Sequence, residues 1–390
     1  MDNHHHQQQQ SLIKELPFPV PRKRNKLYVY YSTMGYLFQI VRDIDPKLRL
    51  MIDTFTLIGF IYTTRFLWTI TSSVFNGFYV HVWSRIWFRQ DLAKKYGKWA
   101  IITGATDGIG LEYARQFAER GINIILLGRN TDKLTRVRTQ LIDMNRERNI
   151  QIISIQADLN SDDRQMYQRI WREIDPENRE IGILVNNAGV MFDSPNRFLD
   201  QPETKLWEHV RVNMLAVIMM TRLVLPSMVK RKKGLVINVA SIAGYQPLPL
   251  MGVYSASKVN HDFFQIKTIT ITFSLYNFHL KIFVEWFSQS LDIEYRKSNI
   301  EVQTLIPNYI GTKMTGFSSL LQTRSLMYPD AQTFTANAIA TIGRSRLTSG
   351  YWFHDLSHFF TKLFIPNWAY RTISWYFLKQ IDSSKTNKTN

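Results

Sequence analysis

The chain has 390 residues, of which 45% are hydrophobic and 20% charged, so its composition is that of a globular protein with a sizeable core. It contains no cysteine, which excludes disulfides, a thiol nucleophile and Cys-ligated metal sites, and leaves the redox compartment open. The net charge of +17 suits an anionic membrane surface, an anionic cofactor or nucleic acid, so charge alone does not identify the partner.

Residues 1–27 are expected to form a low-complexity, basic tail. They begin MDNHHHQQQQ, and no second group of ligands accompanies the three His to complete a metal site. We therefore expect a solvated tail and no bound metal. A basic run follows, made up of Arg22, Lys23, Arg24 and Lys26.

Residues 28–97 are expected to form a hydrophobic, membrane-associated helical segment. The stretch from Phe66 to Ser84 carries no formal charge over 19 residues, close to the roughly 20 that cross a bilayer. Thr, Ser, Asn and His side chains dilute this signal, and an amphipathic helix packed on the soluble body is the alternative. Basic residues flank both ends, so the positive-inside rule gives no orientation.

From residue 98 the sequence alternates short β-branched runs with helical patterns, as parallel sheets covered on both faces do. Six buried strands are predicted, at 99–103, 123–127, 151–156, 183–186, 235–239 and 301–306. Helices are predicted between them, at 109–120, 131–146, 163–174, 203–230 and 283–296. Right-handed crossovers then give an α/β fold, a Rossmann doubly wound parallel sheet over residues 98–347.

Residues 348–390 form an extension rich in aromatic residues, among them Trp352, Phe360 and Trp368. Such a density fits a surface lying in a lipid interface or a lid over an apolar substrate. Ordinary packing on the domain explains it equally well.

A glycine-rich turn links the first predicted strand to the first predicted helix. In TGATDGIG, Gly104 permits the tight turn, Gly108 lets the backbone approach a pyrophosphate, and Gly110 allows close helix packing. The helix N-terminus then faces the phosphates. The cofactor-binding residues expected in this turn are Gly104, Thr106, Asp107, Gly108, Ile109 and Gly110.

The end of the second predicted strand indicates which dinucleotide binds. NAD-binding folds usually place an acidic residue there, whereas this chain has Gly128 followed by Arg129. A guanidinium pairs well with a 2′-phosphate, which favours NADP(H). Asp158, after the third predicted strand, fits either a contact with the adenine amino group or a cap at the strand end.

Ser241, Tyr254 and Lys258 form the predicted catalytic group. Tyr254 and Lys258, in YSASK, are four residues apart and so share one face of a helix. A phenol titrates at about 10, and the ammonium of Lys258 is expected to lower the pKa of Tyr254. Tyr254 then exchanges a proton with the substrate oxygen, Ser241 donates a hydrogen bond to it, and Lys258 also holds the nicotinamide ribose. Asn213 is placed to hold a water that links Lys258 to solvent.

With VNNAG (Val185 to Gly189), these motifs resemble the short-chain dehydrogenase/reductase superfamily over about 250 residues. The segment DLAKKYGKWAIITGATDGIG, with GYWFHD and IPNW, is similar to a narrower group: 17-beta-hydroxysteroid dehydrogenase-type very-long-chain 3-oxoacyl-CoA reductases and hydroxysteroid dehydrogenase-like proteins. The resemblance implies an endoplasmic reticulum membrane enzyme that acts on a lipid ketone. It implies a catalytic tetrad of Asn213, Ser241, Tyr254 and Lys258, and adds Asn187 and Thr312 to the cofactor contacts.

Two features set the chain apart from that group. Some hydroxysteroid dehydrogenase-like proteins replace the catalytic tyrosine and are considered inactive, whereas this chain keeps Tyr254. Residues 259–281 also separate Lys258 from the FVEWFSQSLDIEYR helix that directly follows the lysine in relatives. These 23 residues have strand-like composition and are either a translated retained intron or a genuine insertion. Under either alternative, the interruption is expected to displace Lys258.

We therefore expect an NADPH-dependent, membrane-associated reductase of a lipid ketone, either a 3-oxoacyl-CoA or a ketosteroid, with Tyr254 as proton donor. The alternatives are oxidation of a hydroxysteroid and a catalytically silent scaffold. Nucleic acid is not expected as a partner, because no recognition motif accompanies the basic run at 230–233. The resemblance implies a homodimer, and the insertion lies on a helix commonly used for that contact.

Overall fold

The computed structural model describes residues 46–83, 90–174, 177, 179–192, 195–243, 248–258, 283–316 and 323–386, together with Gly35. The chain divides into two compact units, Met1–Ser72 and Ser73–Asn390. The tail at 1–27 and the insertion at 259–281 lie outside the described residues, so the expectations about them stay predictions.

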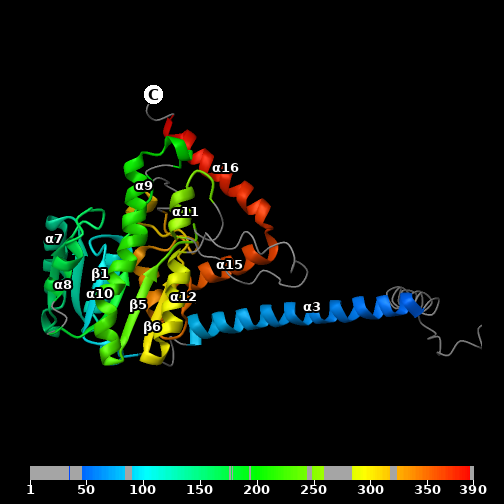
Figure 1. Cartoon of the computed structure of the whole chain (residues 1–390), viewed down its shortest axis with the longest axis horizontal. Helices are drawn as coiled ribbons and strands as arrows, with labels where there is room; N and C mark the ends of the chain where they lie inside the picture. The colour runs from blue at the N-terminus through cyan, green and yellow to red at the C-terminus, as the bar shows by residue number, and fades with distance from the viewer. Residues whose placement is uncertain are drawn as a thin grey trace, which may run out of the picture. The chain divides into compact units, whose positions relative to one another are not determined.

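A parallel sheet of seven strands, in the order β3-β2-β1-β4-β5-β6-β7, forms the centre of the second unit (Figure 1). The strands are β1 (Trp99–Thr103), β2 (Asn123–Gly128), β3 (Ile152–Gln156), β4 (Ile181–Asn186), β5 (Gly234–Val239), β6 (Ile300–Leu305) and β7 (Leu347–Thr348). All six predicted strands are present, with ends shifted by at most two residues. Strand β7 was not predicted, because two residues carry no periodic signal.

Helices cover both faces of this sheet. Side chains alternate between the two faces along each strand, which shows which helices pack on which face. Ala100 and Ile102 of β1 point into one core, and Trp99 and Ile101 point into the other. The first core is covered by α6 (Gly108–Ala118), α7 (Thr131–Met144) and α14 (Ala331–Ala340). The second is covered by α8 (Met166–Ile174), α10 (Ala216–Arg231) and α12 (Phe283–Tyr295). The predicted doubly wound α/β fold is therefore confirmed.

The helix predicted at 203–230 is interrupted. It consists of α9 (Glu203–Val210), a π-helical turn η4 (Arg211–Leu215) and α10. A π-helical turn inside an α-helix could not be predicted here, because the composition of this segment is helical throughout. Asn213 lies in it and is fully buried.

Two described helices are long and apolar enough to cross a membrane. The first runs from Lys47 to Trp83, through α3 (Pro46–Phe78) and the π-helical turn η1 (Tyr79–Trp83), and its most apolar stretch is wholly exposed. The second, Glu203–Arg231, is half-buried by its packing on the sheet, as a core helix is. The uncharged stretch at 66–84 therefore falls on a helix that begins at Pro46, within the segment 28–97 predicted to be helical.

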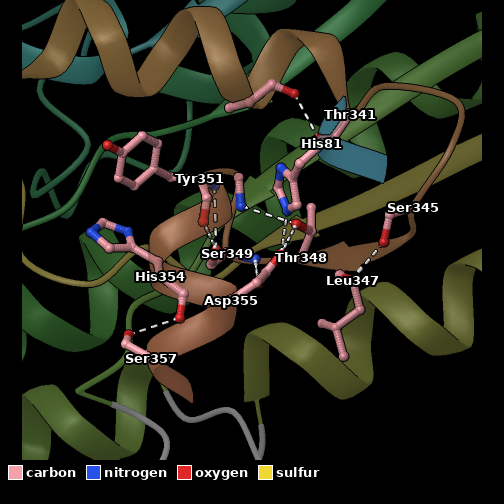
Figure 2. A network of polar contacts seen from close by, with 12 residues as sticks. His81, Thr341, Ser345, Leu347, Thr348, Ser349, Tyr351, His354, Asp355 and Ser357 are labelled. Carbon is pink, nitrogen blue, oxygen red and sulfur yellow. Dashed lines mark hydrogen bonds and ion pairs between the residues drawn. The ribbon is translucent and has the colours of Figure 1, made fainter. Parts of the chain in front are cut away.

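Asp355 joins three segments of the second unit (Figure 2). It lies on α15 (Trp352–Phe364), and its carboxylate accepts hydrogen bonds from His81 Nε2 at 2.6 Å, Thr348 Oγ1 at 3.0 Å and the Ser349 N–H at 2.8 Å. Burial acts to raise the pKa of Asp355, but His81 and the Ser349 N–H outweigh it and hold this pKa below its ordinary value. Asp355 thus fixes the turn η1 to the C-terminal extension.

Replacing Asp355 by Ala is expected to destabilise the protein by about 1–3 kcal/mol, because three hydrogen-bond donors, including the buried His81, lose their acceptor. Chemical denaturation in detergent measures the change. Asp143→Ala is the control: Asp143 forms an exposed ion pair with Arg146, and its loss should cost less than about 0.5 kcal/mol. Equal effects of the two substitutions would contradict the role given to Asp355.

Candidate active site

The site lies where the strand order reverses. Strand β1 pairs with β2 on one side and with β4 on the other, so chain crossovers leave this point in opposite directions. In open α/β sheets, ligands bind in the crevice outside the carboxyl ends of the strands at such a point. The glycine-rich turn follows β1, and Asn187 follows β4, so both lie at this crevice.

The glycine turn adopts a backbone that requires its glycines. Gly104 and Gly108 have φ angles of +65° and +53°, in the left-handed region that other residues rarely occupy. A Cβ on Gly110 would lie 2.3 Å from the carbonyl oxygen of Gly104, so α6 packs against the turn too closely for a side chain. Asp107 caps α6 by accepting a hydrogen bond from the Gly108 N–H at 3.0 Å.

Asn187 fastens this turn to the end of β4. Its Nδ2 donates to the carbonyl oxygens of Thr103 and Gly104 at 3.0 and 3.2 Å. Thr103 Oγ1 accepts from the Asn187 and Ala188 N–H groups, both at 3.0 Å. The side chain of Asn187, predicted from the resemblance as a cofactor contact, therefore shapes the site by holding its two walls together.

The residues around the turn fit a dinucleotide. A Cβ on Gly108 would lie 3.3 Å from Thr312 Cγ2, which places Thr312, in the segment after β6, beside the turn. Lys313 extends from that segment to Asp107, with the ammonium 2.5 Å from the carboxylate. The N-terminus of α6, the bare backbone of Gly108 and the adjacent Thr312 form a cradle with the donors that a pyrophosphate requires. Thr106 and Ile109 complete the turn between these residues.

Arg129 and Asp158 lie after β2 and β3, at the same edge of the sheet. The guanidinium of Arg129 is 72% exposed and lies 3.9 Å from Glu208, a distance at which a phosphate would compete readily. Asp158 is exposed, and its Oδ1 accepts from the Asn160 N–H at 3.1 Å. Asp158 thus forms the strand-end cap that the sequence allowed.

Tyr254 and Lys258 are both buried on α11 (Gly252–Lys258). Tyr254 is hydrogen-bonded to Ser241, which follows β5 and which the sequence predicts to polarise the substrate oxygen. Lys258 Nζ donates to the carbonyl oxygen of Val239 at 3.1 Å. A Cβ on Gly189 would lie 3.3 Å from that nitrogen, so the bare backbone of Gly189 leaves the ammonium uncovered.

The pKa of Tyr254 is raised, whereas the sequence predicted that Lys258 would lower it. Burial raises it, and the hydrogen bond from Ser241 only partly opposes the rise. Burial also lowers the pKa of Lys258, to about 8. Because the Lys258 ammonium is directed at a backbone carbonyl, burial dominates the titration of both groups in the protein alone.

Asn213 connects the segment after β4 with α11. Its Oδ1 accepts from the Val190 N–H at 2.8 Å, and its Nδ2 donates to the Val190 carbonyl and to Ser257 Oγ, both at 3.0 Å. A Cβ on Gly189 would lie 3.4 Å from Asn213 Oδ1, so Asn213 and Lys258 border the same glycine. The structure thus brings Asn213 beside Lys258, and the water predicted between Lys258 and solvent stays a prediction.

His209 is a site residue that sequence reasoning missed. It is fully buried, stacks on Phe192 with ring centroids 4.1 Å apart, and meets the ring of Tyr254 edge-on at 6.1 Å. Its Nδ1 donates to the Lys205 carbonyl, whereas Nε2 has no partner in the described part of the chain. Burial lowers the pKa of His209, so this ring is neutral and presents a bare acceptor beside Tyr254. The sequence signal that could have indicated His209 is its position four residues before Asn213, a spacing that places two side chains on one face of a helix.

The surroundings of Tyr254 are apolar. Its ring packs with Phe192, Leu248 and Met251, and a cavity of about 140 Å³ lined by Phe192, Leu248 and Val253 adjoins this cluster. Leu378 of α16 (Asn367–Thr386) is 2% exposed within the same cluster, and α16 runs toward α9 and α11 (Figure 1). The C-terminal extension therefore packs against the apolar side of the site.

Replacing Lys258 by Met is expected to stabilise the protein without cofactor at pH 7 by roughly 1–3 kcal/mol, because Met fills a buried position without a charge. The unfolded chain keeps the Lys258 proton up to the ordinary pKa of 10.5, whereas the folded chain releases it at about 8. Between these values the unfolded state binds more protons, so the wild type gains stability as the pH rises. The advantage of the Met variant should shrink over that interval.

Thermal unfolding at several pH values from 7 to 10.5 measures this difference. Lys133→Met, at an exposed position on α7, serves as the control and should show no such trend. A stability difference between wild type and Lys258→Met that stays constant with pH would contradict the burial of an ionisable Lys258.

Comparison with known proteins agrees with this geometry. The family model described as short chain dehydrogenase matches residues 98–265. The Homo sapiens protein named inactive hydroxysteroid dehydrogenase-like protein 1 is 34% identical over 339 residues, which cover 87% of this chain and 94% of that one. The Mus musculus very-long-chain 3-oxoacyl-CoA reductase is 35% identical over 289 residues, which cover 74% of this chain and 81% of that one.

Among solved structures, a short-chain dehydrogenase from Sphingobium yanoikuyae in complex with NADPH superposes with a TM-score of 0.52. It is 25% identical, and the match covers 64% of this chain and 86% of that one. The chain therefore belongs to the short-chain dehydrogenase family of oxidoreductases.

Proposed function

We propose that this protein is an NADP(H)-dependent reductase of a lipid ketone. The observation that carries the proposal is the hydrogen bond between Ser241 and Tyr254, which is buried in an apolar cluster and shares α11 with the buried Lys258. The relative named very-long-chain 3-oxoacyl-CoA reductase supports this substrate class, and the neighbour solved with NADPH supports the cofactor.

Bound NADPH would supply a hydride to the carbonyl carbon of the substrate. The chain's own residues act on the carbonyl oxygen. Ser241 donates a hydrogen bond that polarises it, and Tyr254 gives it a proton, so the product is an alcohol. The raised pKa of Tyr254 keeps the phenol protonated at neutral pH, which is the form that donates. Lys258 stabilises the phenolate left behind, with its ammonium beside the bare backbone of Gly189.

The apolar cavity that adjoins the cluster around Tyr254 favours a hydrocarbon substrate. Its lining includes Phe192, Phe198, Leu248, Leu250 and Val253, with Asn196 and Gln201 as its polar members. A fatty-acyl chain or a steroid ring system gains free energy by leaving water for such a surface. Oxidation of a hydroxysteroid uses the same residues in reverse, and the proton-donating form of Tyr254 favours reduction.

We also propose that α3 anchors the protein in a membrane, that of the endoplasmic reticulum. Its apolar side chains are exposed, and the hydroxyls of Thr54, Thr56 and Thr69 donate to carbonyl oxygens four residues earlier in the helix. These bonds satisfy the polar groups internally, as a lipid environment requires. The threonines that dilute the hydropathy are therefore compatible with a bilayer.

A catalytically silent scaffold is the second candidate, favoured by the relatives named inactive hydroxysteroid dehydrogenase-like protein 1. Against it stands the complete set of Ser241, Tyr254 and Lys258. The two candidates differ in turnover, because a scaffold that keeps the glycine turn would still bind NADPH.

Tyr254→Phe is expected to lower turnover by about 10²- to 10⁴-fold, because the proton donor is removed, and to leave NADPH affinity nearly unchanged. NADPH consumption with a long-chain 3-oxoacyl-CoA and with a ketosteroid measures turnover, and nicotinamide fluorescence measures binding. Tyr167→Phe is a matched control, since this buried hydroxyl has no partner within the described residues. A wild type that binds NADPH but reduces neither substrate would establish the scaffold instead.

Arg129→Ser is expected to weaken NADPH binding by about 10- to 100-fold while leaving NADH binding unchanged, because only the 2′-phosphate loses a charged partner. Glu208→Gln should strengthen NADPH binding, since it removes the carboxylate that lies 3.9 Å from the guanidinium. Arg136→Ser, at an exposed position on α7, is the control. Equal losses for NADPH and NADH in Arg129→Ser would contradict the assignment.

A further inference from the structure

Helix α15 has one apolar face that packs on the protein and another that is exposed. Four large apolar residues at intervals of four occupy the exposed face, because this spacing places side chains on one side of a helix. These residues are Trp352, Leu356, Phe360 and Phe364. On the buried side, His354 is 0% exposed and Phe353 packs against one core of the sheet.

Helix α16 has the same two-sided character. Tyr370 and Leu378 pack in the apolar cluster around Tyr254, whereas Trp368 and Tyr376 are exposed. The exposed pair precedes the packed pair by two residues, a shift that turns a helix by about 200° and so places the two pairs on opposite sides. Figure 1 shows α15 and α16 meeting at a corner, so their exposed faces belong to one stretch of surface.

The corner between the two helices is strongly exposed. Of the apolar residues described on α15 and α16, Phe364 and Trp368 are the most exposed, at 69% and 72%. Ile365 between them is also exposed, and Phe360 stacks on Phe364 with ring centroids 6.0 Å apart. Soluble proteins rarely expose contiguous apolar surface of this kind unless it contacts a partner or a membrane.

The charges of α15 and α16 favour a lipid surface over a second copy of the chain. The two helices carry four basic and two acidic residues, and one of the acidic residues, Asp355, is taken up by hydrogen bonds within the protein. The ammonium of Lys379 lies over the ring of Trp375, 4.9 Å from its centroid. A surface that combines aromatic rings with positive charge attracts anionic lipid head groups, whereas two copies would bring like charges together.

The lengths of the helices favour a position in the plane of the membrane. Helix α15 has 13 residues, fewer than the roughly 20 that cross a bilayer. Helix α16 has 20 residues, but it is not among the described helices that are apolar enough to cross. Interfacial helices bury one apolar face at the boundary between head groups and acyl chains, where Trp is enriched. Trp352 and Trp368 both lie on the exposed faces.

We propose that the corner between α15 and α16 inserts into the surface of a lipid bilayer that contains anionic lipid. Phe364, Ile365 and Trp368 enter the outer part of the acyl-chain region, and the basic residues of the two helices contact the head groups. The opposite side of α16 packs on the apolar cluster around Tyr254, so a hydrocarbon substrate would leave the bilayer close to the proposed active site. The contact itself rests neither on the reductase activity nor on α3.

A single fluorescent label tests the contact, because the chain has no cysteine and Ile365→Cys introduces one thiol. The full-length variant is reconstituted into vesicles of equal amounts of phosphatidylcholine and phosphatidylserine. Phosphatidylcholine that carries a nitroxide on its acyl chain should quench most of the emission of the label, and aqueous iodide should quench little of it. Met144→Cys, at an exposed apolar position at the end of α7, is the matched control and should show the reverse.

The double variant Phe364→Glu, Trp368→Glu, made together with Ile365→Cys, tests the corner residues. A carboxylate is costly among acyl chains, so the label should lose its quenching by the nitroxide lipid and become open to iodide. Both positions are exposed, and circular dichroism and NADPH binding report on the fold. If the double variant fails to fold, the comparison of the labels at positions 365 and 144 decides the result.

Vesicle flotation separates this contact from α3. If α3 anchors the protein, the double variant still floats with the vesicles while its label loses contact with lipid. A double variant that no longer floats would contradict anchoring by α3 and would still support the contact at the corner.

Three results would overturn the inference. One is a label at position 365 that iodide quenches as strongly as the label at position 144. Another is a label shielded from both iodide and the nitroxide lipid, because protein, from the same chain or a second copy, would then cover the corner. The third is unchanged quenching by the nitroxide lipid in a folded double variant.

Discussion

The fastening of the glycine turn to the end of β4 is the constraint on which the site depends. Thr103 and Asn187 exchange hydrogen bonds across the junction of β1 and β4, and Gly110 lets α6 approach the turn without a side chain between them. These contacts fix the direction of the α6 N-terminus and the position of Gly189, beside which Lys258 and Asn213 lie. The cofactor cradle and the catalytic group are thus two sides of one junction.

Burial, rather than charge pairing, governs the chemistry of Tyr254 and Lys258. Each group is disfavoured in its charged form, so burial raises the pKa of the phenol and lowers that of the ammonium. A protonated Tyr254 suits reduction, in which the first requirement is a proton for the developing alkoxide. In the proposed reduction, the apolar cluster around Tyr254 would therefore both receive the substrate and keep the phenol protonated.

The sequence predicted the strands, the glycine turn and the positions of Ser241, Tyr254 and Lys258, because each has a local signal: β-branched runs, glycine spacing or a helical i, i+4 pair. It failed where structure depends on contacts between distant segments. The π turn at Asn213, the partner of Lys258 and the place of His209 follow from packing between α9, α11 and the end of β4, which no single stretch encodes. The link from His81 to Asp355 spans 274 positions and has no sequence signature.

An enzyme and a catalytically silent scaffold differ in the residues that they need, because a scaffold needs only those that stabilise the fold. Asn187 and Asn213 satisfy backbone groups at the junction, so a scaffold would need them as much as an enzyme would. Lys258 is different. Burial lowers the pKa of its ammonium to about 8, which shows that burying the charged group is unfavourable for folding. A scaffold would be more stable with an apolar residue there, whereas a catalyst needs the cation beside a phenolate. The retention of Lys258 together with Tyr254 therefore favours catalysis.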